Sequence, residues 1–326
     1  MPAHLRQQGV EPSLVLADCG LPPEALSLPD ARIPFAATGA LLDAAARRTG
    51  RDDFALHFGQ TLRLAHLGAV GELARHAATL GDALRAVAVH QCLHSRGALT
   101  FLITDGGSAF FGYSVYRALA AGGDLLQDAV AGLIFNGMRE LVGGEWLPDQ
   151  VLLARRQPVV PAAYRRAFRV AVGFDEEFTG LRFPVQALGR PTAAADRRRF
   201  DILQAQIAAA MQPELIDDLR RTLRVEMLRG QTHGNRVAQV LDMHRRTLDR
   251  RLRDLGVTFQ RVRDEVRFDT ARHFLQLTDM PLLHIACALG YAEASSFARA
   301  FRRWSGSSPG RFRARPQGLP APQGGR

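Results

Sequence analysis

The chain has 326 residues, 47% of them apolar, which is enough to bury two hydrophobic cores of ordinary size. Its formal charge of +10 comes from Arg alone, because it contains no Lys, and the excess lies in residues 220–326, where 21 Arg face 9 acidic residues. This composition argues against a mainly disordered chain and against a membrane protein, since no apolar run approaches the roughly 18 residues of a membrane helix.

Three cysteines, Cys19, Cys92 and Cys287, are widely separated and lack CxxC spacing. This pattern is typical of buried, reduced thiols rather than of a disulfide framework or a zinc site. The start of the chain has no apolar run of the kind found in signal peptides. We therefore expect a cytoplasmic protein with no membrane segment, no metal and no cofactor.

Residues 1–190 predict an α+β domain. Helical spacing of Ala, Leu and Val fills the first 80 residues and continues through "GDALRAVAVH". In "ALTFLITDGGSAFFGYSVY" two apolar runs flank Asp105-Gly106-Gly107, which indicates a hairpin; a phosphate-binding loop is the alternative, but no helix follows. The remaining expected elements are a helix at 125–142, a strand at 149–156, a short helix at 162–168 and an extended segment at 180–188.

Several polar residues of this domain could line a ligand pocket, or could be surface and structural groups instead. They are His90, His94, Arg96, Tyr113, Tyr116 and Arg117. If "HQCLH" were a strand, His90, Cys92 and His94 would share one side and could hold a metal, although no fourth ligand is close in the sequence.

From residue 191 the pattern changes. "GRPTAAADRRRF" loses apolar periodicity, which predicts a linker with a leading helix over 191–218. Residues 219–315 indicate only helices and short turns, so we expect an all-α domain there. A disordered tail is expected at 316–326.

The all-α domain contains an internal repeat. Val237-Ala238 is followed by Asp242-Met243 and Leu248, and Ile285-Ala286 by Gly290-Tyr291 and Phe297. A small residue lets two helices approach, a turn residue follows four positions later, and an apolar residue anchors the second helix. Two helix-turn-helix units are predicted, with a long helix between them. Asp279 is the expected cap of the helix after it, and Ser308-Pro309 opens a final short helix.

The segment "IACALGYAEASSFARAFRRWSGSSPGRFR" resembles the signature of AraC/XylS-type bacterial transcriptional regulators, and the resemblance covers about residues 220–315. Residues 1–190 are more weakly similar to the arabinose-binding-type effector domain of one branch of that family. The resemblance implies sequence-specific binding to double-stranded DNA, a small-molecule effector, self-association as a homodimer, and activation through contact with RNA polymerase.

The first reading helix expected from this resemblance is "HRRTLDRRLRDLG". Leu248 and Leu252 lie on its buried side, so Arg246, Asp249 and Arg250 point outward together, and the same three match the base-reading positions of the family. Either Arg could be bidentate to guanine, whereas Asp249 could accept from cytosine or orient an Arg. The resemblance makes His244 and Arg245 phosphate contacts. A solvated charged face is the alternative.

In the second reading helix, Phe297 and Phe301 are expected in the core with Tyr291. The outward residues are Ser295, Ser296 and Arg299, and Arg302 and Arg303 stand where backbone contacts are expected. The first helix-turn-helix departs from the family at Asp242, where Gly is usual, and at His244, where a small hydroxyl residue often caps the helix. Asp tolerates the left-handed turn, so we expect the turn to be kept.

Three other functions remain possible from the sequence: a repressor, a non-specific architectural DNA binder, and a DNA-repair methyltransferase fused to this DNA-binding unit. The last needs an activated Cys in a Pro-Cys-His setting, and none of the three cysteines has it. The sequence also lacks a nucleophile elbow, a Walker loop and an HExxH helix. We therefore expect a protein that is not an enzyme.

Overall fold

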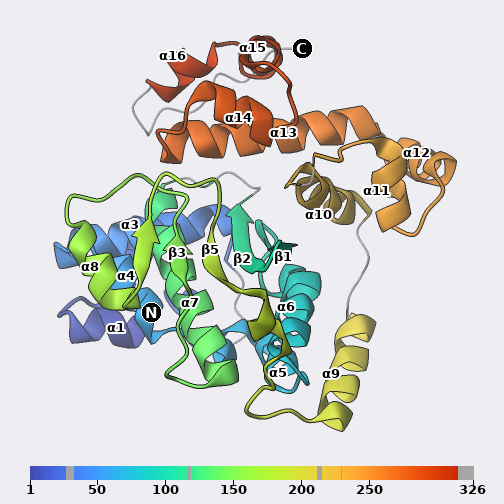
Figure 1. Ribbon diagram of the computed structural model, residues 1–326. Helices are drawn as coiled ribbons and strands as arrows, with labels where there is room; N and C mark the ends of the chain where they lie inside the picture. Colours follow the sequence, from blue (N-terminus) through green and yellow to red (C-terminus); the bar gives the residue numbers. More distant parts are fainter. Residues whose placement is uncertain (27–32, 116–118, 120, 211–214, 229, 315–326) are drawn as a thin grey trace. The chain divides into compact units, whose positions relative to one another are not determined.

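The computed structural model describes residues 1–26, 33–115, 119, 121–210, 215–228 and 230–314 (Figure 1). The chain forms two compact units, Met1–Ala210 and Met211–Arg326. Within the described residues, no helix is both long and apolar enough to cross a membrane. Tyr116, Arg117 and the expected tail at 316–326 lie outside the described residues.

The first unit combines helices with one five-stranded sheet, as the sequence predicts (Figure 1). Its α-helices are α1 (Pro2–Gln7), α2 (Pro12–Asp18), α3 (Phe35–Thr49), α4 (Phe54–Thr61), α5 (Ala69–Arg75), α6 (Leu80–His94), α7 (Gly123–Val142), α8 (Pro161–Phe168) and α9 (Arg197–Ala210). Its 3₁₀ helices are η1 (Pro23–Leu26), η2 (Leu64–Leu67) and η3 (Val185–Gly189). Its strands are β1 (Ala98–Asp105), β2 (Ser108–Val115), β3 (Gln150–Leu152), β4 (Ala171–Gly173) and β5 (Thr179–Pro184).

The sheet has the strand order β1-β2-β5-β3-β4, with one parallel pair, β3 and β4. Strand residues alternate between the two faces, and one face of β1 and β2 packs under α6 and α7. The main core lies in this layer and includes Phe111 and Tyr113 of β2 and Ile134 and Met138 of α7. A second core lies among α1 to α4. The sheet therefore forms the floor of a helical layer, and a cavity lies within that layer.

The predicted hairpin is confirmed. Asp105 pairs with Ser108, and Gly106 and Gly107 form the turn with φ of +59° and +143°, values that favour Gly. The predicted helix at 125–142 is also confirmed as α7. Other boundaries differ, because the strand expected at 149–156 is only β3, the extended segment at 180–188 ends as η3, and β4 was not expected. Strands of three residues are too short to show the alternation of apolar and polar residues from which a strand is predicted.

A buried ionic network joins α7 to α8 and to the chain after β3. The Asp128 carboxylate is fully buried and accepts from Arg155 Nη1 and from the Tyr164 hydroxyl, which is 2.8 Å away. Burial raises the pKa of Asp128 to about 7, and the positive charge of Arg155 opposes that rise. The network ties together three elements that are distant in the sequence.

Helix α9 lies within residues 191–218, expected as a linker with a leading helix, and it packs against α5 of the first unit. Leu203 and Ile207 of α9 are buried, and Phe200 packs against the main core. The first unit therefore extends past residue 190 to Ala210. Leu203 and Ile207 are four positions apart, so both lie on one face of α9. Burial of this face explains why the segment folds with the first unit.

The second unit is entirely helical within its described residues, as expected. It contains α10 (Leu215–Leu228), α11 (Gly234–Val240), α12 (Arg245–Asp254), α13 (Phe259–Leu277), α14 (Leu282–Ala288), α15 (Ala294–Ser305) and α16 (Pro309–Arg313). Ser308 caps α16 as predicted, since its hydroxyl accepts from Arg311 N. The expected cap at Asp279 is wrong: α14 begins after Pro281, so Asp279 stands too far from the first turn.

Candidate DNA interface and effector cavity

The two helix-turn-helix units of the repeat have the same turn geometry. Met243 N donates to Ala238 O and Tyr291 N donates to Ala286 O, both at 2.9 Å. The turn residues Asp242 and Gly290 have φ of +52° and +75°. The left-handed turn predicted at Asp242 is therefore confirmed, and the chain re-enters each second helix, α12 or α15, along the same path.

Helix α12 buries one face and exposes the other. Leu248 and Leu252 are fully buried, whereas Arg246 and Arg250 are exposed and Asp249 is half-buried. The amphipathic spacing of Leu at i and i+4 produces this separation. His244 precedes the helix as an exposed residue, and its side chain makes no capping hydrogen bond.

Arg245 differs from its neighbours because its guanidinium is held by the protein. Arg245 Nε donates to Asp249 Oδ2 at 2.8 Å, and its guanidinium carbon lies 4.2 Å from the centre of the Phe259 ring. It also covers Gly234, where a Cβ would collide with Arg245 Nη1. One side chain therefore joins the start of α11, the first turn of α12 and the start of α13. Asp249 pairs with Arg245, as the alternative in which it orients an Arg requires.

Helix α15 buries Phe297 and Phe301 fully and exposes Ser295 and Arg299, while Tyr291 is half-buried. Arg250 and Arg299 occupy the same place, since each is the sixth residue of its helix. Two hydrogen bonds organise the exposed face of α15: the Ser295 hydroxyl donates to Glu293 Oε2 at 2.9 Å, and Arg299 Nη2 donates to the half-buried Ser296 at 3.2 Å.

The two arginines that end this face differ in their contacts. Arg302 and Arg303 are both exposed. Arg303 Nη2 lies 3.3 Å from Asp264 Oδ2 of α13, and its guanidinium also lies near the Trp304 ring. The Arg303 side of this ion pair is exposed, and such a pair is weak, so Arg303 can exchange it for another anion at little cost.

Arg267 of α13 contacts both halves of the repeat. Its Nη2 donates to Thr232 Oγ1 at 3.3 Å, just before α11, and its guanidinium stacks 4.8 Å from the Tyr291 ring in the second turn. Burial lowers the pKa of Arg267, and Tyr291 partly opposes this. One buried side chain of α13 therefore contacts both helix-turn-helix units. Packing within Met211–Arg326 thus fixes the spacing of α12 and α15.

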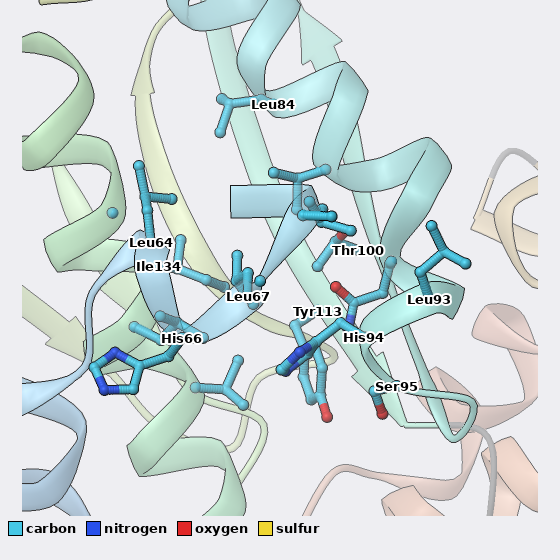
Figure 2. Close-up of a pocket in the computed structure, with 18 of the residues that line it drawn as sticks. Leu64, His66, Leu67, Leu84, Leu93, His94, Ser95, Thr100, Tyr113 and Ile134 are labelled. Atoms are coloured by element: carbon cyan, nitrogen blue, oxygen red, sulfur yellow. The ribbon is translucent and has the colours of Figure 1, made fainter. Parts of the chain in front are cut away.

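The first unit contains a cavity of about 970 Å³ between the sheet and its helices. Figure 2 shows Leu64, Leu67, Leu84 and Ile134 around it, with the His94 imidazole, the Ser95 hydroxyl and the Tyr113 hydroxyl on one side. Of the 29 described residues that line it, 18 are apolar and none is Asp or Glu. A largely apolar cavity with a few polar groups is typical of a small-molecule site.

Three of the six polar residues suggested by the sequence line this cavity: His94, Arg96 and Tyr113. His90 is buried in α6 and is not among the lining residues. The metal alternative is wrong in its geometry, because "HQCLH" ends helix α6 and a two-residue spacing does not keep Cys92 on the side of His90 and His94. Among the described residues, no three His, Cys, Asp or Glu side chains gather as a metal site requires. None of the three cysteines forms a disulfide, and the expectation that they are buried is wrong: Cys19 and Cys92 are half-buried and Cys287 is exposed.

Sequence reasoning missed Thr100 and the residues of α9 in the cavity wall. Thr100 is 7% exposed, it faces the cavity, and its hydroxyl has no hydrogen-bond partner. Leu203, Gln206 and Ile207 of α9 close another side. No local signal separates such residues from ordinary core, because the cavity exists only where elements from residue 33 to residue 207 meet.

Comparisons with known proteins agree with both halves of this arrangement. Residues 9–192 match the "Arabinose-binding domain of AraC transcription regulator", and residues 237–315 match a helix-turn-helix domain family. The chain is 30% identical to the HTH-type transcriptional regulator VirS of Mycobacterium tuberculosis, over 95% of this chain and 93% of VirS. It is 28% identical to the ornithine utilization regulator of Pseudomonas aeruginosa, over 90% and 88% of the two chains. A segment covering 21% of this chain is 41% identical to the HTH-type transcriptional activator RhaS of Escherichia fergusonii, of which it covers 25%. The chain is a DNA-binding transcriptional regulator and belongs to the AraC family.

Proposed function

We propose that this regulator activates transcription in response to a small effector and reads its operator with α12 and α15. The observation that carries the proposal is the equivalence of the two exposed helix faces, each with an Arg at its sixth position, on one body held together through α13. In a helix-turn-helix the second helix enters the major groove. Two such helices on one body would meet successive grooves, about 34 Å apart along one DNA face.

Arg246, Arg250 and Arg299 are the proposed base readers, because all three are exposed and a guanidinium matches the guanine edge. Ser295 and Ser296 add short contacts, and Asp249 acts through Arg245 or on cytosine. His244, Arg302 and Arg303 are the proposed phosphate contacts. Arg245 is the least suited of the expected phosphate contacts, because Asp249 and Phe259 already hold its guanidinium.

The test is DNA binding by the full chain to an operator found by genome-wide mapping of its sites, measured beside random DNA. We expect the operator to be preferred by roughly a thousandfold or more. Replacing Arg246, Arg250 or Arg299 by Ala should weaken operator binding by about ten-fold or more while leaving random DNA nearly unchanged. Arg302→Ala should weaken both alike.

The matched control is Arg85→Ala, which removes an exposed Arg from α6 of the first unit. It should leave both affinities unchanged. Equal loss on operator and random DNA for all three proposed base readers would instead support the architectural alternative.

The effector would act through α9, since this helix lines the cavity and directly precedes the second unit. A ligand that binds one arrangement of α9 better than another shifts the population toward it, and this changes DNA affinity by the same coupling free energy. A reporter gene placed behind the operator decides between activation and repression: effector should raise transcription, and a fall would contradict the activator assignment.

We also infer, from the family resemblance, a cytoplasmic homodimer that contacts RNA polymerase. A dimer would read repeated or inverted copies of the composite site, and sedimentation of the full chain should give twice the 35.7 kDa of one chain. The role proposed is binding alone, so methyl transfer from alkylated DNA to the protein would contradict it.

A further inference from the structure

The cavity of the first unit separates its charged lining residues from its neutral polar ones. We propose that it binds an uncharged, largely apolar molecule that carries a hydroxyl or carbonyl oxygen, and that this oxygen bonds to Thr100. The inference rests on the proposed effector role of this domain, and it names the chemical class of the effector.

The apolar wall determines the body of the ligand. Leu64, Leu67, Leu84 and Ile134 belong to the apolar majority of the described lining (Figure 2). A sugar buried there would leave most of its hydroxyls without hydrogen-bond partners, and each such group costs free energy. An alkyl chain or a ring system instead gains free energy from every apolar contact. We therefore infer a mainly hydrocarbon body, for which a cavity of about 970 Å³ has room.

The lining residues that can carry a charge near neutral pH are exposed to solvent. In the described lining they are His66, His94 and Arg96, and no carboxylate is among them. Each of the three already interacts with another group of the chain: the Arg63 backbone N–H, for example, donates to His66 Nδ1 at 3.0 Å. Their charges therefore belong to the solvated part of the lining and supply no counter-charge in its buried part.

The buried polar residues of the described lining are neutral. They are Gln91, Thr100 and Tyr113, which are 5%, 7% and 5% exposed. A carboxylate or an ammonium group among them would lose its hydration without meeting an opposite charge, which costs far more than the burial of a neutral polar group. The buried part of the cavity therefore disfavours ligand groups of either charge.

Thr100 is the residue to which we assign the ligand oxygen. It pairs across the sheet with Tyr113, so both side chains lie on the face of β1 and β2 that lines the cavity. The Thr100 hydroxyl is buried and has no hydrogen-bond partner among the described residues. A buried hydroxyl without a partner costs free energy, and a ligand oxygen can recover it, because a hydroxyl can donate to a carbonyl or accept from an alcohol.

The experiment measures displacement of a neutral fluorescent probe, N-phenyl-1-naphthylamine, from the full chain. Four competitors share a ten-carbon chain and differ in their polar group: 1-decanol, 2-decanone, decanoate and decylammonium. L-Arabinose is the fifth. We expect the alcohol and the ketone to displace the probe at concentrations about ten-fold or more below those that the two ions require, because only the ions must bury a charge. Arabinose should have no effect.

Two substitutions at Thr100 test the position of the oxygen. Thr100→Val keeps the shape and removes the hydroxyl, so it should weaken decanol and decanone by about five-fold while the unfolding midpoint stays the same or rises. Thr100→Ser keeps the hydroxyl and should retain most of both affinities. Arg96→Gln and Arg85→Ala are the controls, and neither should change displacement by the two neutral compounds.

Stronger displacement by decanoate or decylammonium than by decanol would overturn the proposal, because the cavity would then supply a counter-charge. Equal affinities for decanol and decanone in the Val variant and the original chain would overturn the role of Thr100, and a probe that does not bind would contradict an apolar site. Operator binding without effector is measured separately and depends on the second unit. A failed ligand assignment therefore leaves the DNA-binding proposal standing, and a failed DNA assay leaves the ligand result intact.

Discussion

Arg245 shows how the same residue type has different uses on one helix. Arg246 and Arg250 are exposed, but Arg245, one position earlier, is held against Phe259 and Asp249. A guanidinium stacked on an aromatic face contributes about 0.5–2 kcal/mol, and the partly exposed ion pair adds less than about 1 kcal/mol. We therefore infer that Arg245 positions α12 relative to α11 and α13.

Replacing Arg245 by Ala should lower the free energy of unfolding of the DNA-binding unit by about 1 kcal/mol, since both contacts are lost. Operator affinity should fall only as far as α12 loses its position, and the salt dependence should keep its slope. Chemical denaturation of the full chain and titration at several salt concentrations measure the two effects. Arg251→Ala, at an exposed position of the same helix, is the stability control. An unchanged stability with a shallower salt slope would make Arg245 a phosphate contact after all.

At the scale of elements, the two turns show that the repeat is built by backbone geometry and tolerates a change of residue type. Asp242 and Gly290 take the same left-handed conformation, and both turns close with the same pair of backbone hydrogen bonds. Asp pays less than most side chains for this conformation, because its short polar group can bond locally.

The change Asp242→Ala should therefore destabilise the DNA-binding unit by about 1 kcal/mol, whereas Asp242→Gly should leave it unchanged or slightly more stable. Gly290→Ala in the second helix-turn-helix should lower the free energy of unfolding by a similar amount. Thermal unfolding of the full chain measures each shift, with Asp254→Ala as a control at the exposed end of α12. If Ala were tolerated as well as Gly at 242, the positive φ would not be what this position requires.

Helices and the hairpin could be predicted because each depends on residues close in the sequence. Leu248 and Leu252 fix the buried face of α12, and Gly106-Gly107 fixes a two-residue turn. Strands β3 and β4 could not be predicted in their true extent, since three residues gain their structure only by pairing with a neighbour. The cap expected at Asp279 was wrong for a related reason: Asp is a good capping residue, but the structure starts α14 only after Pro281.

At the scale of the whole molecule, the formal charge is divided unequally along the chain. Residues 220–326 carry a formal +12, from 21 Arg and 9 acidic residues, and the rest of the chain carries −2. Several arginines of the second unit are tied to acids, as in Arg220–Glu265 and Arg236–Glu226, so the formal charge overstates what faces DNA. The exposed arginines of α12 and α15 remain for the partner.

We expect the logarithm of operator affinity to fall with the logarithm of salt concentration at a slope steeper than about −3, because each neutralised phosphate contributes about −0.9. Arg302→Ala should reduce this slope by about one contact. Arg85→Ala in the first unit should leave it unchanged. Fluorescence anisotropy of labelled operator at a series of salt concentrations gives the slope directly, and a nearly flat response would contradict a regulator held by phosphate contacts.

The sequence by itself determined the class of fold, the repeated helix-turn-helix and the outward faces of α12 and α15. These depend on local spacing, left-handed turn residues and net charge, all of which can be seen along one segment. Only the tertiary structure decided that α9 belongs to the first unit, that Phe259 and Asp249 hold Arg245, and that an apolar cavity lies behind Thr100 and Arg96. These features join side chains far apart in the chain, and an apolar residue has the same sequence pattern whether it fills a core or lines a cavity.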